Sequence, residues 1–155
     1  MANPITILVD ADACPVKGEV YRVARRYGIA VKVVAGAFLA VPDDPAIERV
    51  AAGGGWGAAD DWIAARAGEG VVVVTADVPL AARCVAAGAV AIGPTGREFT
   101  PAGIGMALAM RNLMEDVRAG GETTGGPKPF SARDRSRFLS ALDEAIVRLR
   151  RAGFA

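Results

Sequence analysis

The sequence contains no histidine, only two cysteines and few aromatic side chains. Without histidine the chain lacks the commonest general base and every imidazole ligand for a metal. The cysteines, Cys14 and Cys84, fall in different predicted elements, and the first residues contain no secretory signal. We therefore expect two free thiols in a cytoplasmic protein, and polar chemistry that depends on carboxylates, hydroxyls, thiols, Lys or Arg.

Long apolar runs are also absent. Val71–Val74 is typical of the longest ones, whereas a membrane span needs roughly 18 apolar residues, so we expect no association with a membrane. The composition is nevertheless 52% hydrophobic and 23% charged over 155 residues, as in one folded domain. The net charge is +1, with a surplus of basic residues after residue 117. This basic tail is interpreted as a solvated helix face, with a nucleic-acid contact as the alternative.

Predicted strands alternate with predicted helices through the first 93 residues. Pro15 and Pro79 suit the first turn of a helix, and Gly28 and Gly88 suit the position just after one. The apolar, β-branched runs between them are typical of buried parallel strands joined by helical crossovers, which predicts an α/β fold. The strand order that we expect for this sheet is 3-2-1-4-5. The third strand is also compatible with a helical turn. The predicted strands are 5–9, 31–35, 47–52, 71–75 and 89–92, and the predicted helices are 15–27, 58–67 and 79–87.

Beyond residue 93 the pattern is helical, and we expect no strand after Ile92. One helix is predicted from Thr100 to about Arg118, and another begins at Ser131, which forms a capping box with Asp134. The second helix has an apolar face suited to packing on the sheet. We predict a single domain over 1–155, with an α/β core at 1–93 and C-terminal helices at 100–155.

Three aspartates follow the ends of two predicted strands. Asp10 and Asp12 are two residues apart after the first strand, and Asp77 follows the fourth. In open α/β sheets ligands bind at the carboxyl ends of strands where the strand order reverses, and if the order is 3-2-1-4-5 these two strands are neighbours there. Gathered carboxylates attract a cation, and oxygen ligands favour Mg²⁺ or Mn²⁺, which activates water and stabilises charge on a phosphoryl group. Alternatively, Asp12 and Asp77 are helix caps.

Four long segments carry a resemblance to a known family. They are VDADACPVK, AADDWI, TADVPLAARCVAAGA and TGGPKPFSARDR. With these segments the sequence resembles the YaiI/YqxD family of uncharacterised bacterial proteins, whose fold is thought to be similar to the PIN domain. The resemblance implies a three-layer PIN-like domain and a Mg²⁺- or Mn²⁺-dependent nuclease that acts on RNA.

The resemblance also assigns roles to individual residues. Asp10 and Asp77 match the PIN aspartates at strand ends, Asp12 adds a carboxylate, and Asp60 or Asp61 matches the acidic residue at the start of a middle helix. It implies metal binding by all five and catalysis by Asp10, Asp12, Asp60 and Asp77. PIN nucleases have a further carboxylate soon after the position of Asp77, whereas the next acidic residue here is more than twenty residues later. A non-catalytic module that binds RNA or a protein therefore stays open.

Other residues extend or compete with this hypothesis. Thr75, Lys128 and Arg133 are candidate contacts for phosphate or nucleic acid. A phosphatase of the haloacid-dehalogenase type is a lesser alternative, in which Asp10 is the nucleophile and Asp12 the general acid, but it needs a downstream lysine in a suitable element. Two tryptophans at positions 56 and 62 lie on either side of the acidic pair Asp60 and Asp61 and are able to stack bases, although core packing is the expected role at position 62.

Overall fold

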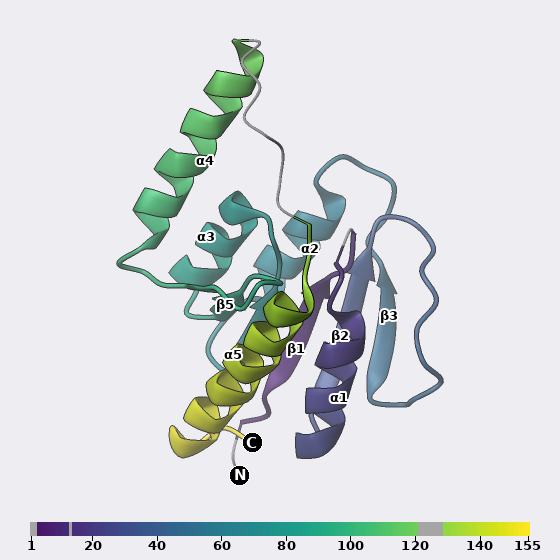
Figure 1. Ribbon diagram of the computed structural model, residues 1–155. Helices are drawn as coiled ribbons and strands as arrows, with labels where there is room; N and C mark the ends of the chain where they lie inside the picture. Colours follow the sequence, from purple (N-terminus) through teal and green to yellow (C-terminus); the bar gives the residue numbers. More distant parts are fainter. Residues whose placement is uncertain (1–2, 13, 121–128) are drawn as a thin grey trace.

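A six-stranded sheet with helices on both faces forms the body of the protein (Figure 1). The computed structural model describes residues 3–12, 14–120 and 129–155. The strands are β1 (Thr6–Asp10), β2 (Ala30–Ala35), β3 (Ile47–Ala51), β4 (Val71–Val74), β5 (Val90–Ile92) and β6 (Glu98–Phe99). The helices are α1 (Lys17–Tyr27), α2 (Ala58–Arg66), α3 (Val78–Ala86), α4 (Ile104–Ala119) and α5 (Ala132–Arg151).

The strand order is β3-β2-β1-β4-β5-β6. The first five strands are parallel, so the predicted α/β class and the order 3-2-1-4-5 are confirmed, including the strand interpretation of the third segment. The expectation of no strand after Ile92 is wrong, because β6 pairs antiparallel with β5. β6 contains only two residues, one charged and one buried, and so short a segment has no detectable alternation.

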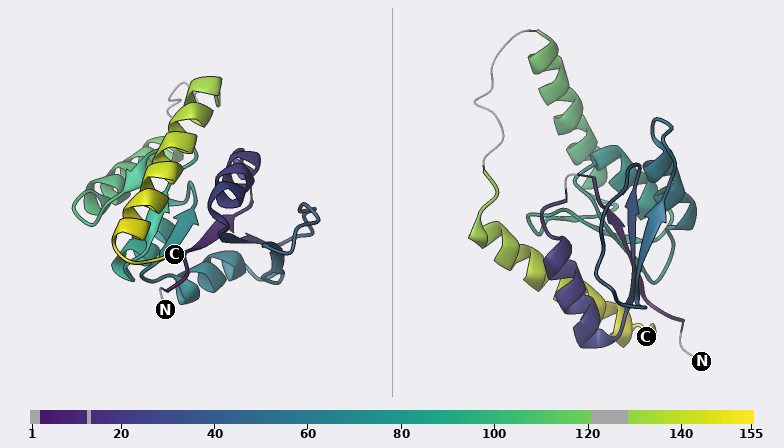
Figure 2. Two further views of the ribbon diagram at one scale, coloured as in Figure 1. Left: turned by 90° about the horizontal axis from the view of Figure 1, so that it is seen from below. Right: turned by 90° about the vertical axis from the view of Figure 1, so that its right-hand side faces the viewer.

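Helices cover both faces of the sheet and make three layers (Figure 2). Alternate residues of a strand point to opposite faces. On β1, Ile7 and Val9 pack with α1 and α5, whereas Leu8 packs with α2 and α3 on the other face. The predicted three-layer arrangement with C-terminal helices on a mostly parallel sheet is therefore confirmed.

The two C-terminal helices behave differently. The predicted capping box of α5 is present, and Phe138 and Leu142 are buried against the sheet and α1. α4 begins at residue 104 instead of Thr100, because the Thr100 hydroxyl accepts a hydrogen bond from the N–H of Gly103 in a preceding turn. α4 contacts α3 and extends away from the body (Figure 2). Within the described ranges, no helix combines the length and the apolar character that crossing a bilayer requires.

Candidate functional site

A cavity of about 440 Å³ lies at the carboxyl ends of β1 and β4. Four carboxylates line it, and we call them together with the cavity the acidic pocket: Asp10, Asp12, Asp60 and Asp77. Its other lining residues are Cys14, Val74, Thr75, Ala76 and Pro94. The structure therefore brings together residues from β1, α2 and the β4–α3 connection that are far apart in the sequence.

The alternation of the strands explains why these side chains meet. Asp10 follows Leu8 by two residues on β1, and Thr75 follows Val73 by two residues after β4, so both continue the face that α2 and α3 cover. β1 and β4 are adjacent and in register, with Val9 opposite Val74. As a result, Asp10 and Thr75 emerge side by side under the first turns of α2 and α3.

Thr75 connects two of the aspartates through hydrogen bonds. Its hydroxyl donates to Asp10 Oδ2 at 2.7 Å and accepts from the backbone N–H of Asp77 at 3.0 Å. Thr75 is a polar residue buried in the core, and its hydroxyl both donates and accepts a hydrogen bond. The predicted candidate Thr75 therefore lies in the pocket, where it fixes the orientation of the Asp10 carboxylate.

The pKa of Asp10 is raised to about 6, mainly by burial and also by the neighbouring carboxylates Asp60, Asp12 and Asp77, while the hydrogen bond from Thr75 lowers it. The pKa of Asp60 is also raised, mainly by burial and then by Asp77. These shifts arise because the pocket concentrates negative charge in a partly desolvated place. A group that titrates near neutrality in a cleft is a candidate for function.

The structure separates the two acidic residues at the start of α2. Asp60 lines the acidic pocket, whereas the Asp61 side chain is 71% exposed and forms an ion pair with Arg83 at 2.9 Å. Adjacent residues on a helix point in directions about 100° apart, so only one of them can face the pocket. The sequence left this choice open.

The alternative that the aspartates are helix caps holds for one of them. Asp77 is the N-cap of α3, and its Oδ1 accepts a hydrogen bond from the N–H of Leu80 at 2.9 Å. The N-cap of α1 is Val16, with no side-chain cap, so Asp12 is not a cap. Asp12 is exposed and faces the cavity without that structural role.

The remaining candidates lie elsewhere. Arg133 is exposed in the first turn of α5 and is not among the residues that line the acidic pocket, and Lys128 falls outside the described residues. Cys14 lines the pocket, which the sequence did not indicate; burial raises the pKa of its thiol, and both cysteines are free as predicted. Trp62 packs beside the second core cluster as expected.

The donors of the pocket are chemically suited to a hard cation. Carboxylate and hydroxyl oxygens are the ligands of Mg²⁺ and Mn²⁺, and among the described residues no Lys or Arg side chain lines the cavity to neutralise them. Across residues 3–12, 14–120 and 129–155, however, no three His, Cys, Asp or Glu side chains already stand as a metal-binding group. The carboxylates share a cavity but do not yet converge on one point.

The comparisons with known proteins agree on one family. The pattern described as the uncharacterised YaiI/YqxD family matches residues 8–148. A protein called "UPF0178 protein" from Nitrobacter winogradskyi is 65% identical over 148 residues, covering 96% of this chain and 94% of its own length. A protein with the same name from Rhodopseudomonas palustris strain BisB18 is 63% identical and covers 97% of this chain and 97% of its own length. Another from Azorhizobium caulinodans is 62% identical and covers 98% of this chain and 96% of its own length. No solved structure matches the chain significantly.

Proposed function

The chain belongs to the YaiI/YqxD family, and we propose that it is a Mg²⁺- or Mn²⁺-dependent hydrolase that cleaves phosphodiester bonds of RNA in the acidic pocket. The observation that carries this proposal is the assembly of four carboxylates in one cavity, with the pKa of Asp10 raised to about 6 by burial and by the other three. A divalent cation relieves that repulsion and favours the ionised form of Asp10.

The proposed cation is held by Asp10, Asp12 and Asp60, with Asp77 beside them. When bound, such a cation polarises a phosphoryl oxygen and lowers the pKa of bound water. Thr75 holds the Asp10 carboxylate in place through its 2.7 Å hydrogen bond. Asp77 contributes one oxygen to the cap of α3, which leaves its other oxygen for the pocket.

A single-stranded substrate is favoured by an exposed aromatic side chain near the pocket. Trp56 is fully exposed in the glycine-rich connection between β3 and α2, four residues before Asp60. Four virtual Cα–Cα bonds of 3.8 Å limit the distance between these Cα atoms to about 15 Å. A base of an RNA bound in the acidic pocket is therefore within reach of Trp56, and stacking on an exposed ring is independent of sequence.

The first test is metal binding, measured as the thermal midpoint with Mn²⁺ or Mg²⁺. A ligand that binds only the folded state raises the midpoint, so we expect a rise that the Asp10→Asn/Asp12→Asn variant loses. Asp61→Asn is the matched control, because Asp61 lies in the same first turn of α2 as Asp60 but is paired with Arg83 and does not line the pocket. No rise at millimolar metal, or an equal rise in the double variant, contradicts the proposed metal site.

The second test is cleavage of RNA with Mn²⁺. Wild-type protein and Asp61→Asn should cleave, and Asp10→Asn should not, because Asn cannot supply the charge of the carboxylate. If Asp10→Asn cleaves as fast as wild type, the activity comes from a contaminant and the hydrolase proposal is wrong.

A non-catalytic RNA- or protein-binding module is the second candidate. It is favoured by the spread of the carboxylates, which form no ready-made metal group within the described residues, and by the position of Glu98. Glu98, the next acidic residue after Asp77, pairs with Arg148 on α5 and does not line the pocket. This candidate predicts RNA binding that weakens as salt rises, without turnover. The phosphatase alternative gains no support, because no described lysine lines the cavity.

A further inference from the structure

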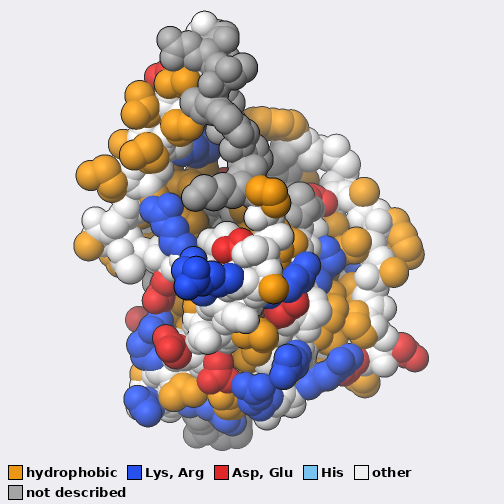
Figure 3. All heavy atoms as spheres, viewed as in Figure 1, with side chains coloured by type: hydrophobic (Ala, Val, Ile, Leu, Met, Phe, Trp, Pro, Cys, Tyr) orange, Lys and Arg blue, Asp and Glu red, His pale blue; other side chains and the backbone are white. Residues whose placement is uncertain are grey.

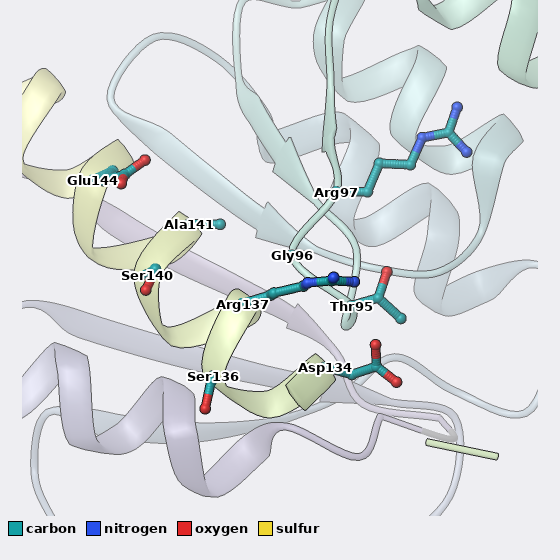
Figure 4. A pocket seen from close by; sticks show the side chains of 9 residues that line it. All are labelled: Thr95, Gly96, Arg97, Asp134, Ser136, Arg137, Ser140, Ala141 and Glu144. Atoms are coloured by element: carbon teal, nitrogen blue, oxygen red, sulfur yellow. The ribbon is translucent and has the colours of Figure 1, made fainter. Parts of the chain in front are cut away.

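We propose that an open hollow beside the acidic pocket holds the phosphates of the nucleotides that neighbour the cleaved one. The proposal rests on the proposed function, because it supplies the contacts that an RNA strand needs outside the acidic pocket. The hollow has a volume of about 910 Å³ and lies between the 93–97 loop and α5 (Figure 4). Thr95, Gly96 and Arg97 line it from the loop, and Arg137 lines it from α5 together with the carboxylates of Asp134 and Glu144. We call it the arginine hollow.

The acidic pocket needs such a partner for electrostatic reasons. Its four carboxylates repel a polyanion, and no described basic side chain lines it. An RNA strand therefore has to be held by cations placed beside the pocket. Figure 3 shows many basic side chains on the face of the molecule over α5, with acidic ones between them.

The two sites adjoin along one loop. Pro94 lines the acidic pocket, and the next residue, Thr95, lines the arginine hollow. The loop follows β5, whose partner β4 leads into the acidic pocket, so both sites lie at the same end of the sheet. An RNA chain that leaves the acidic pocket past Pro94 therefore enters the hollow directly. When one phosphodiester is bound in the acidic pocket, the next phosphate along the RNA lies in the hollow.

The loop is held firmly against α5. A Cβ atom added to Gly96 would approach the backbone carbonyl carbon and oxygen of Arg137 to 2.7 Å, and Gly96 has a φ of 89°, which favours glycine. The N–H of Gly93 donates to the carbonyl of Arg97 at 2.7 Å and closes the loop. The backbone around the hollow is thus ordered before any ligand arrives, which lowers the entropic cost of binding.

The two arginines remain available for phosphate. In Figure 4 the Arg137 side chain reaches across the hollow toward Thr95. The Arg97 side chain leaves the loop on the other side, with its guanidinium 5.3 Å from the centroid of the Phe99 ring, so it flanks the hollow at its rim. Within the described part of the chain, neither guanidinium forms an ion pair. Asp134, which also lines the hollow, accepts a hydrogen bond from the N–H of Ser131 in the capping box. Arginine is well suited to phosphate because its planar group donates two parallel hydrogen bonds.

The test measures binding of a short unstructured RNA by fluorescence anisotropy, in EDTA and in an Asp10→Asn background, so that no turnover occurs. Arg97→Ala/Arg137→Ala should weaken binding about tenfold or more, because each lost contact is charge-assisted. It should also reduce the slope of log affinity against log salt by about 1.4, since each contact on a single strand contributes about 0.7. Lysine at both positions should restore most of the salt dependence.

The matched control is Arg22→Ala/Arg151→Ala, which removes the same charge from exposed positions on α1 and at the far end of α5. Arg151 lies fourteen residues beyond Arg137, about 21 Å along the helix. This control should change affinity far less than the test variant. Equal effects of the two double variants, no effect of the test variant, or no RNA binding by any of the proteins would overturn the proposal.

Two further results distinguish the possible failures. If free phosphate or a mononucleotide displaces the RNA at equal phosphate concentration, the hollow is a single-phosphate site and the strand proposal is wrong. If binding depends on Arg97 and Arg137 but no RNA is cleaved with Mn²⁺, the hollow stands and the hydrolase proposal fails. If RNA is cleaved with Mn²⁺ and the KM is unchanged in Arg97→Ala/Arg137→Ala, the hydrolase proposal stands and the hollow proposal is wrong.

Discussion

Replacing Asp10 with asparagine should stabilise the metal-free protein at neutral pH. The Asp10 carboxylate is partly buried among three other carboxylates, and its pKa is raised from 3.8 to about 6. Asparagine has nearly the same shape, and its carbonyl oxygen still accepts the hydrogen bond that Thr75 donates to Asp10 at 2.7 Å. The substitution therefore removes the buried charge and keeps the packing.

The size of the effect follows from the shift. About two pKa units correspond to about 3 kcal/mol at 1.36 kcal/mol per unit. Asp10 is only partly buried, so screening by solvent reduces this to about 1.5 kcal/mol. In a domain of about 150 residues 1 kcal/mol shifts the midpoint by roughly 2–4 °C, so we expect Asp10→Asn to unfold about 3–6 °C higher than wild type at pH 7.

The direction of the pH dependence is fixed by the sign of the shift. The folded pKa of Asp10 lies above its unfolded value, so the folded state binds the proton more tightly. Its favourable contribution is complete below about pH 3.8 and is lost as the pH rises through about 6. The advantage of Asp10→Asn should accordingly be full above pH 6 and vanish near pH 4.

The assay is thermal unfolding of wild type, Asp10→Asn and Asp61→Asn in EDTA between pH 4 and 7.5. Asp61 is exposed and paired with Arg83, so its substitution should give no stabilisation in this window. The argument fails if Asp10→Asn is no more stable than wild type at pH 7, or if its advantage is the same at every pH. Saturating Mn²⁺ should reverse the order, because only the wild type retains the complete site.

Three other substitutions test parts of the same region. Thr75→Val should lower the free energy of unfolding by about 2 kcal/mol in urea titrations, because Asp10 and the N–H of Asp77 both lose a partner, whereas Thr75→Ser should lose much less. Asp77→Ala should lower the free energy of unfolding by about 1 kcal/mol through loss of the α3 cap, and Asp77→Asn should lower it much less. Loss of metal binding in the stable Asp77→Asn variant would assign Asp77 to the metal site. Unchanged metal binding would exclude Asp77 from it. Trp56→Ala should weaken RNA binding about tenfold without changing the thermal midpoint, and a lower midpoint would mean that Trp56 is structural.

Much of the fold follows from local patterns in the sequence. The apolar runs, the prolines at helix starts and the glycines after helices predicted the alternation of elements and a parallel sheet. The strand order 3-2-1-4-5 was expected together with the PIN-like fold that the resemblance implies. The gathering of Asp10 and Asp77 followed from that order alone. Thr75 was identified because it ends the strand that pairs with β1.

The features that the sequence did not predict depend on how elements rotate against one another. Whether Asp60 or Asp61 faces the pocket is decided by how α2 is rotated as it packs Ile63 into the core. The 93–97 loop reaches the backbone of Arg137 only because Gly96 allows it to contact α5, and no spacing indicates such a contact over forty residues. The exposed apolar face of α4, with Met106, Met110 and Leu113, would have been expected in the interior.

The outer strand β3 is the place where the sheet is exposed to pairing with another molecule. Among the residues that the structure describes, β3 pairs with β2 alone, so its other side presents unpaired backbone groups that could recruit a strand from another molecule. Glu48 and Arg49 are exposed on this five-residue strand, and Lys32 of β2 lies 3.9 Å from Glu48. Burying these charges against a strand of another molecule is unfavourable. The charged residues that weaken the strand signal of β3 in the sequence therefore also oppose edge-to-edge aggregation of the sheet.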